Sequence, residues 1–132
     1  MTAPTANLTA LQYNLVIPQD ADWPGVTFNL VDSNNAPADL TGCAALGEIR
    51  PSAGSDELYF TWSTSPTTGQ GLLVLDTNAS TLTVRVLDSE STLWTFTDAV
   101  YDIVLTNPAA PVGFRKSRVV MGSVTVSRAV TF

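Results

Sequence analysis

Short runs in which apolar and polar side chains alternate recur along the chain and predict β-strands. Apolar residues hold every second position of residues 11–17, 26–31, 81–86 and 100–107. A period of two places such side chains on one face of a half-buried strand. Segments rich in Pro, Gly, Asn and Asp separate the runs and indicate turns. No segment shows sustained helical periodicity, so the chain is expected to be all-β.

Further strands are expected at residues 43–50, at the aromatic-rich residues 57–63 and at the apolar residues 72–76. The stretch 114–132 predicts either one strand or two strands divided at Gly122, with a C-terminal strand at residues 124–132.

Residues 89–97 differ from the rest, because Ser89 is placed to cap a helical turn. Leu93, Trp94 and Phe96 would then form a short helical plug at one end of the core. The whole pattern predicts an antiparallel immunoglobulin-like β-sandwich of seven to nine short strands, or a small barrel.

The 132 residues suggest a single domain, residues 1–132, whose small, Pro-containing residues 1–8 form a flexible N-terminal arm. The hydrophobic content of 45% and the charged content of 14% argue against disorder. A surface this poor in charge is common where a protein packs against neighbours in an assembly, and a homo-oligomer is one option.

A net charge of −6 makes nucleic acid a poor partner, because binding phosphates needs clustered Lys and Arg. Four of the six basic residues lie near the C-terminus, where strand-like neighbours indicate solvated positions: Arg115, Lys116, Arg118 and Arg128. No apolar run is long enough to span a membrane, and no signal peptide is evident. We therefore expect synthesis in the cytoplasm.

The usual catalytic and metal-binding residues are scarce. The chain has no His and one Cys, Cys43, so neither an internal disulfide nor a structural zinc site can form. Cys43 lies in an expected strand, which indicates a buried, unreactive thiol. We predict no enzyme activity, no cofactor and no metal.

Carboxylates occur in neighbouring pairs that could in principle serve a glycosidase: Asp20 with Asp22, Asp56 with Glu57, and Asp88 with Glu90. Each pair flanks a turn, where Asp commonly makes local hydrogen bonds, so a structural role is expected. Asp102 lies inside a strand between inward-facing neighbours and should face outward.

The three Trp residues raise the alternative of a glycan- or receptor-binding module. Trp62 and Trp94 lie in segments expected to enter the core. Trp23 lies between Asp22 and Pro24 in a break, so it is the candidate for an exposed ligand or interface residue.

The stretch DSNNAPADLTG, residues 32–42, resembles a calcium loop only in part. Asp32 and Asn34 fit an EF-hand, but Ala36 and Pro37 stand where a ligand and the turn should be, and the terminal Glu is missing. Asn tolerates positive φ and Pro fixes an extended exit, so the stretch predicts a turn between two strands.

Several motifs taken in order resemble small tailed-phage virion proteins and, more loosely, the N-terminal immunoglobulin-like domain of phage upper baseplate proteins. They are LVIPQDADW, VDSNNAPADLTGCAALGEIR, STLTVRVLDSESTLW, VYDIVLTNP and GSVTVSRAVT. The chain departs from that pattern at Asp20, where Gly is usual, and at Asn34-Asn35, which replace a turn containing Gly.

This resemblance implies a non-enzymatic virion structural protein that joins neighbouring subunits, most simply in the tail, baseplate or fibre attachment. A capsid decoration protein is the alternative within that class. Its partners would be other virion proteins, contacted by strand pairing at exposed edges or at the termini. Leu8 in the N-terminal arm and the terminal Phe132, with Trp23, are the candidate interface residues.

Overall fold

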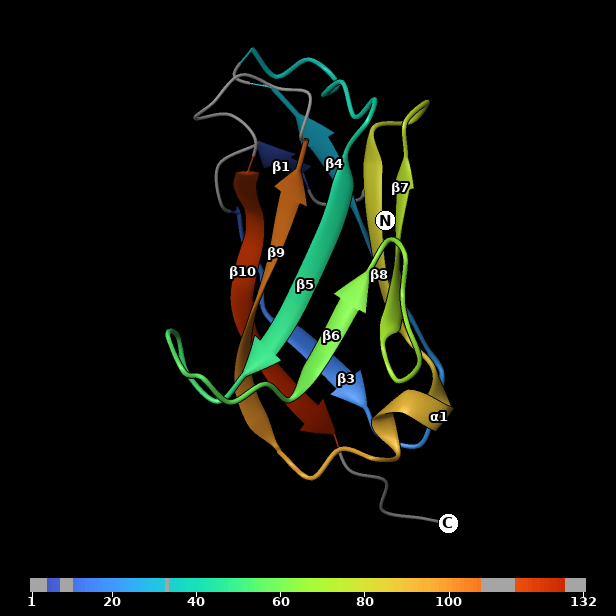
Figure 1. Ribbon diagram of the computed structural model, residues 1–132, viewed down its shortest axis with the longest axis vertical. Helices are drawn as coiled ribbons and strands as arrows, with labels where there is room; N and C mark the ends of the chain where they lie inside the picture. The colour runs from blue at the N-terminus through green and yellow to red at the C-terminus, as the bar shows by residue number, and fades with distance from the viewer. Residues whose placement is uncertain (1–4, 8–10, 33, 108–115, 128–132) are drawn as a thin grey trace.

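The computed structural model describes residues 5–7, 11–32, 34–107 and 116–127, drawn in colour in Figure 1. These residues form strands and one short helix: β1 (Thr5–Asn7), β2 (Leu11–Gln12), β3 (Leu15–Pro18), β4 (Trp23–Val31), β5 (Ala44–Arg50), β6 (Phe60–Ser63), β7 (Gly71–Asp76), β8 (Thr81–Val86), α1 (Asp88–Ser91), β9 (Asp98–Thr106) and β10 (Lys116–Ser127). The predicted all-β class is confirmed.

The strands are hydrogen-bonded along one path, in the order β1-β4-β8-β7-β6-β5-β9-β10-β2, and β3 also pairs with β10. The path curls back on itself, so that β5, β6, β9 and β10 form one layer and β4, β7 and β8 another (Figure 1). Only two residue pairs join the layers at the β6–β7 seam, namely Trp62 with Gly71 and Ser63 with Leu72.

The sheet is mixed, so the prediction of antiparallel pairing throughout is wrong. Among the described residues, β4–β8, β7–β8, β5–β6, β5–β9 and β9–β10 are antiparallel. The pairs β1–β4, β2–β10, β3–β10 and β6–β7 are parallel. Side-chain alternation is the same in both kinds of strand, so the periodicity that revealed the strands carried no information on their direction.

Alternation places one face of each layer in a common core. Phe28 and Leu82 from one layer and Ile17, Ile49 and Ile103 from the other are all fully buried in one cluster. The alternating faces predicted for residues 11–17, 26–31, 81–86 and 100–107 agree with this burial.

Trp62 lies in the core and connects the two layers. Its side chain is fully buried, and its Nε1 donates a hydrogen bond of 3.0 Å to the carbonyl of Arg85 on β8. The predictions that Trp62 and Trp94 enter the core are both confirmed.

Several strand limits differ from expectation. The predicted strand at residues 11–17 is divided into β2 and β3, because its pairing with β10 is interrupted at Tyr13 and Asn14. β4 begins at Trp23, inside the expected break, since a bulge between Trp23 and Val26 accommodates Gly25 at φ 88°. Residues 5–7, expected in a loose arm, pair with β4.

β10 is a single strand that continues through Gly122 to Ser127. A bulge between Arg118 and Val120 lets Val119 and Val120 both face the core. The remainder of the predicted C-terminal strand, residues 128–132, lies outside the described residues.

The predicted plug is present, with two corrections. The helix starts at Asp88, so Ser89 lies inside it, and the carboxylate of Glu90 accepts a hydrogen bond of 2.8 Å from the backbone N–H of Leu87. Trp94 is buried as expected, but Leu93 is 79% exposed. The two are consecutive, and the turn that directs Trp94 inward directs Leu93 to solvent.

Candidate functional site

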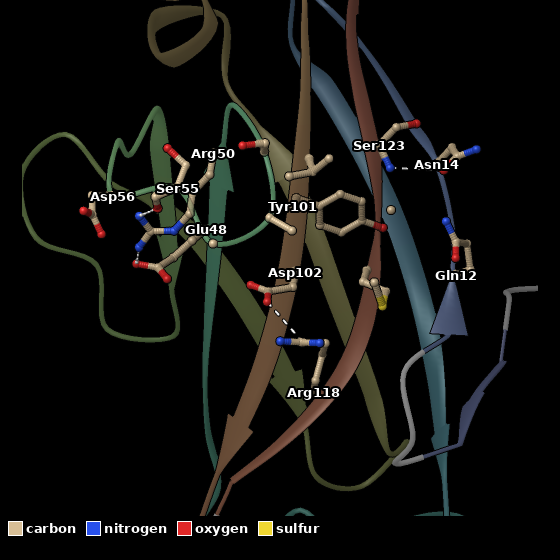
Figure 2. A pocket seen from close by; sticks show the side chains of 16 residues that line it. Gln12, Asn14, Glu48, Arg50, Ser55, Asp56, Tyr101, Asp102, Arg118 and Ser123 are labelled. Carbon is tan, nitrogen blue, oxygen red and sulfur yellow. Dashed lines mark hydrogen bonds and ion pairs between the residues drawn. The ribbon is translucent and has the colours of Figure 1, made fainter.

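A groove of about 690 Å³ lies on the outer face of β5, β9 and β10, beside β2 and the loop at residues 52–56 (Figure 2). The same alternation that buries alternate residues of β5 and β9 directs Glu48 and Asp102 outward. These two are register partners, and Asp102 is in turn opposite Met121 of β10. A row of outward side chains therefore crosses three strands to Gln12 on β2.

Two ion pairs balance the adjacent carboxylates of this row. Arg50 contacts Glu48 at 3.1 Å, and Arg118 contacts Asp102 at 3.2 Å, which also confirms that Asp102 faces outward. Like charges directly opposite each other destabilise a sheet, and the two arginines offset that repulsion. All four side chains are partly exposed, so each pair contributes little to stability by itself.

Arg50 also shapes one wall of the groove. Its guanidinium donates hydrogen bonds to the carbonyls of Ser55 at 2.9 Å and Glu57 at 3.3 Å. It therefore ties the loop that follows β5 to the sheet, as Figure 2 shows for Ser55.

The opposite wall is the N-terminal segment, held by Tyr101 and β10. The Tyr101 hydroxyl donates a 2.5 Å hydrogen bond to the Tyr13 carbonyl, and Asn14 Oδ1 accepts a 3.1 Å bond from the backbone N–H of Ser123. Burial is the main cause that raises the pKa of Tyr101 above its ordinary value, with the nearby Tyr13 second. Tyr101 is thus a neutral hydrogen-bond donor across the physiological pH range.

This lining favours binding over catalysis. The arginines and their carboxylate partners are engaged with each other, and Tyr101 is engaged with backbone. Across the described residues, no three His, Cys, Asp or Glu side chains gather as a metal-binding group. The groove offers hydrogen-bonding and weakly apolar contacts to another molecule.

A smaller cavity of about 390 Å³ lies near α1. Two of its aromatic lining residues stack on the ring of Phe96: Tyr59 at a centroid distance of 4.5 Å and Trp94 at 5.0 Å. Leu93 lines this cavity and is exposed, as is Leu87 at the start of α1.

The structure describes one of the three candidate interface residues, Trp23. Trp23 begins β4, is half-buried against the core, and lines neither cavity. Leu8 and Phe132 lie outside the described residues. Of the three, the structure places only Trp23, and Trp23 does not line the groove.

The remaining candidates have local structural roles. Asp22 Oδ1 accepts a hydrogen bond of 2.9 Å from the backbone N–H of Asp88, and Asp20 accepts one from the Thr92 hydroxyl. Cys43 is half-buried, and burial first and Asp39 second raise the pKa of its thiol. A raised pKa lowers the reactive thiolate fraction, in agreement with an unreactive Cys43.

Residues 32–42 form the predicted turn. Asp32 Oδ1 accepts hydrogen bonds from the backbone N–H groups of Asn34 at 2.8 Å and Ala36 at 3.1 Å, and Asn35 has φ 61°. The carboxylate that began the apparent calcium motif is thus used to close the turn.

No pattern along the chain predicted the groove itself. Glu48, Arg50 and Arg118 are charged residues inside strands, which is a weak sign of an outward face. Their meeting depends on which strands are neighbours, and the chain separates β5 from β10 by many residues.

No helix in the described part of the chain is long and apolar enough to cross a membrane. No protein-family model matches the chain, and no curated protein matches it. Among solved structures, the chain is similar to the N-terminal domain of phage TP901-1 ORF48, with 14% identity and a TM-score of 0.52. The match covers 96% of this chain and 99% of that one. At this identity the similarity concerns the fold, and at that level it confirms the resemblance to a phage protein domain.

Proposed function

We propose that the protein is a non-enzymatic structural component of a phage virion that joins neighbouring subunits in the tail, baseplate or fibre attachment. The observation that carries the proposal is the match to a phage domain over nearly the full length of both chains. The protein would be made in the host cytoplasm and carried in the virion. Its partners would be other virion proteins.

The proposed fold within this class is an immunoglobulin-like sandwich. The order β1-β4-β8-β7 corresponds to strands A, B, E and D of that fold, and β6-β5-β9-β10 corresponds to C′, C, F and G. The parallel β1–β4 pair and the β6–β7 seam are this chain's own features.

The proposed contact surface is the groove on β5, β9 and β10. Its ion pairs and backbone-held walls make it preorganised, which lowers the cost of ordering side chains on binding. Met121 in the groove and the outward Leu46 on the same layer supply apolar contact area. Trp23, Leu8 and Phe132 remain proposed contacts as well.

Labelling of purified virions tests the proposal. Immunogold labelling or cryo-electron microscopy should place the protein on the tail, and label on the head would favour capsid decoration. Absence from virions would overturn the structural role.

A pair of matched variants tests the groove. Met121→Glu adds a carboxylate beside Asp102 and should reduce incorporation into particles. Val74→Glu also adds a carboxylate, on β7, where the Val74 side chain is 41% exposed. This control variant should leave incorporation into particles unchanged. Equal incorporation of both variants would remove the groove from the proposal.

Glycan or receptor binding is the second candidate, favoured only by the partly exposed Trp23. A glycan array is its test. Binding that Trp23→Ala abolishes would support this function, and no binding, or binding that Trp23→Ala leaves unchanged, would exclude it.

A further inference from the structure

The N-terminal strands occupy both ends of the hydrogen-bonded path. β1 lies at one end beside β4, while β2 and β3 lie at the other beside β10. The strands from β4 to β10 pair with one another without any contribution from this segment. β1, β2 and β3 can therefore leave the sheet without separating any two of the remaining strands.

We propose that β1, β2 and β3 are exchangeable strands, which leave the edges of their own sheet and occupy the same edges in a second copy of this chain. Exchange of an identical element preserves each contact while changing the chain that supplies it. The inference goes beyond the proposed function, because it concerns how copies of the chain associate with each other.

The edge of β10 fits the strands β2 and β3 closely. For that reason, we expect the strand that pairs with it after exchange to come from a second copy of this chain. Leu15 and Ile17 enter the core with exposed fractions of 2% and 0%. Between β2 and β3, the Tyr13 carbonyl accepts the Tyr101 hydroxyl and approaches Gly122 so closely that a Cβ there would lie 2.3 Å from its oxygen. An unrelated strand would have to fill the core positions of Leu15 and Ile17 and also fit against Gly122.

The connection from β3 to β4 is a suitable hinge. Only residues 19–22 join the two strands, and Asp20 within them has φ 61°. This is the position where the resemblance expects Gly, and a residue with a Cβ is strained there. In an exchanged pair the hinge runs on to the neighbour, so Asp20 can return to an extended conformation; short, strained hinges favour exchange.

The hinge contacts of Gln19 survive exchange, whereas the hydrogen bonds that join Asp20 to Ser91 and Thr92 and Asp22 to Asp88 belong to the closed form. The Gln19 backbone N–H donates to the Ser127 carbonyl at 2.9 Å, and its side chain donates to the carbonyls of Ser91 at 3.1 Å and Trp94 at 2.8 Å. Gln19 thus docks with β3 and can make the same bonds to a second copy. The closed and exchanged forms differ mainly at Asp20, Ala21 and Asp22.

Cross-linking between separate copies tests the inference. Val16 and Thr125 are register partners on β3 and β10, and both are exposed. In a Cys43→Ser background, purified V16C is mixed with purified T125C under mild oxidation. Exchange predicts disulfide-linked pairs of one copy of each, whose yield rises with protein concentration.

A control pair uses strands that cannot exchange in this way. Leu46 and Val104 are outward register partners on β5 and β9. A mixture of L46C and V104C should give only the linkage that random collisions produce. The double variant V16C/T125C should close within one chain when dilute, which shows that the pair has bonding geometry.

Two hinge variants sharpen the result. D20G relieves the positive φ of the closed form and should lower the linked fraction of the V16C and T125C mixture. Deletion of residues 21 and 22 prevents the segment from reaching its own edge and should double the mass measured by light scattering.

The inference is overturned if V16C/T125C closes internally while the mixed single variants link no more than the control pair. It is also overturned if the deletion variant folds as a monomer. Either result leaves the proposed function standing, since that is judged by the presence of the protein in virions.

Discussion

Gly122→Ala is the most informative single substitution, because the space that it fills belongs to the backbone of another strand. A Cβ at this position would lie 2.3 Å from the Tyr13 oxygen and 2.8 Å from its carbonyl carbon. Ordinary van der Waals contact starts at 3.4 Å, so Tyr13 must move by roughly 1 Å. A shift of that size is enough to break the 2.5 Å hydrogen bond from Tyr101.

Two terms set the magnitude. Forcing a methyl group into packed structure costs about 1–3 kcal/mol. Leaving the buried Tyr101 hydroxyl without its partner costs about 1–3 kcal/mol more. The sum of about 2–6 kcal/mol is a large part of a typical unfolding free energy of roughly 5–15 kcal/mol. With about 2.1 cal/mol/K per residue over 132 residues, a loss of about 3 kcal/mol lowers Tm by roughly 10 °C.

Chemical denaturation of four proteins checks this reasoning: the unaltered chain, Gly122→Ala, Tyr101→Phe and the double variant. Tyr101→Phe alone should cost about 1–2 kcal/mol. Because Gly122→Ala already breaks the same hydrogen bond, the double variant should be less destabilised than the sum of the single variants, by about 1 kcal/mol.

Additivity of the two substitutions within about 0.5 kcal/mol would refute the reasoning. It would mean that Gly122 and Tyr101 do not act through the same Tyr13 carbonyl. A Gly122→Ala variant as stable as the unaltered chain would refute it as well, since the clash would then have no energetic consequence.

Four further outcomes are expected. Gly25→Ala should prevent folding, as judged by circular dichroism, because a Cβ would lie 1.6 Å from the Val84 carbonyl oxygen. Trp62→Phe should lower the unfolding free energy by about 2–4 kcal/mol, through a cavity and the lost bond to Arg85, and unchanged stability would contradict this. Arg50→Ala should cost under about 1 kcal/mol yet speed proteolysis between residues 51 and 57, an effect that Arg85→Ala should not share. Cys43 has a raised pKa, so its alkylation should be slow at pH 8 and accelerate as the pH rises; Asp39→Asn should lower that pKa and speed the reaction.

The alternation of side chains was sufficient to identify most strands and their buried faces. Ile17, Phe28 and Ile103 lie inward as their periodicity indicates, because a strand with one buried face must place an apolar residue at every second position. The resemblance added detail at Asp20, where an expected Gly is replaced by a residue at φ 61°. A conformation that favours Gly is thus recorded in the motif even where this chain departs from it.

The groove depends on information that periodicity does not contain. Glu48 faces Asp102, and Arg118 reaches the same carboxylate, only because β5, β9 and β10 are neighbours in a particular register. A shift of one residue in that register would turn every one of these side chains to the other face. Long-range register is set by the packed core as a whole, and no single segment shows it.

The parallel pairs of the N-terminal segment have a common cause in chain order. β4 and β10 are left with free edges once the strands between them have paired, and each free edge can accept one more strand. The segment preceding β4 is the part of the chain without a place inside the path, so it fills both edges, β1 along β4 and β3 along β10. A strand that fills an edge removes a site for uncontrolled association. When that strand leaves, the same edge can pair with a specific partner. Edge protection and the proposed exchange thus use the same residues, so the stability of the β3–β10 contact should govern how readily copies of this chain associate.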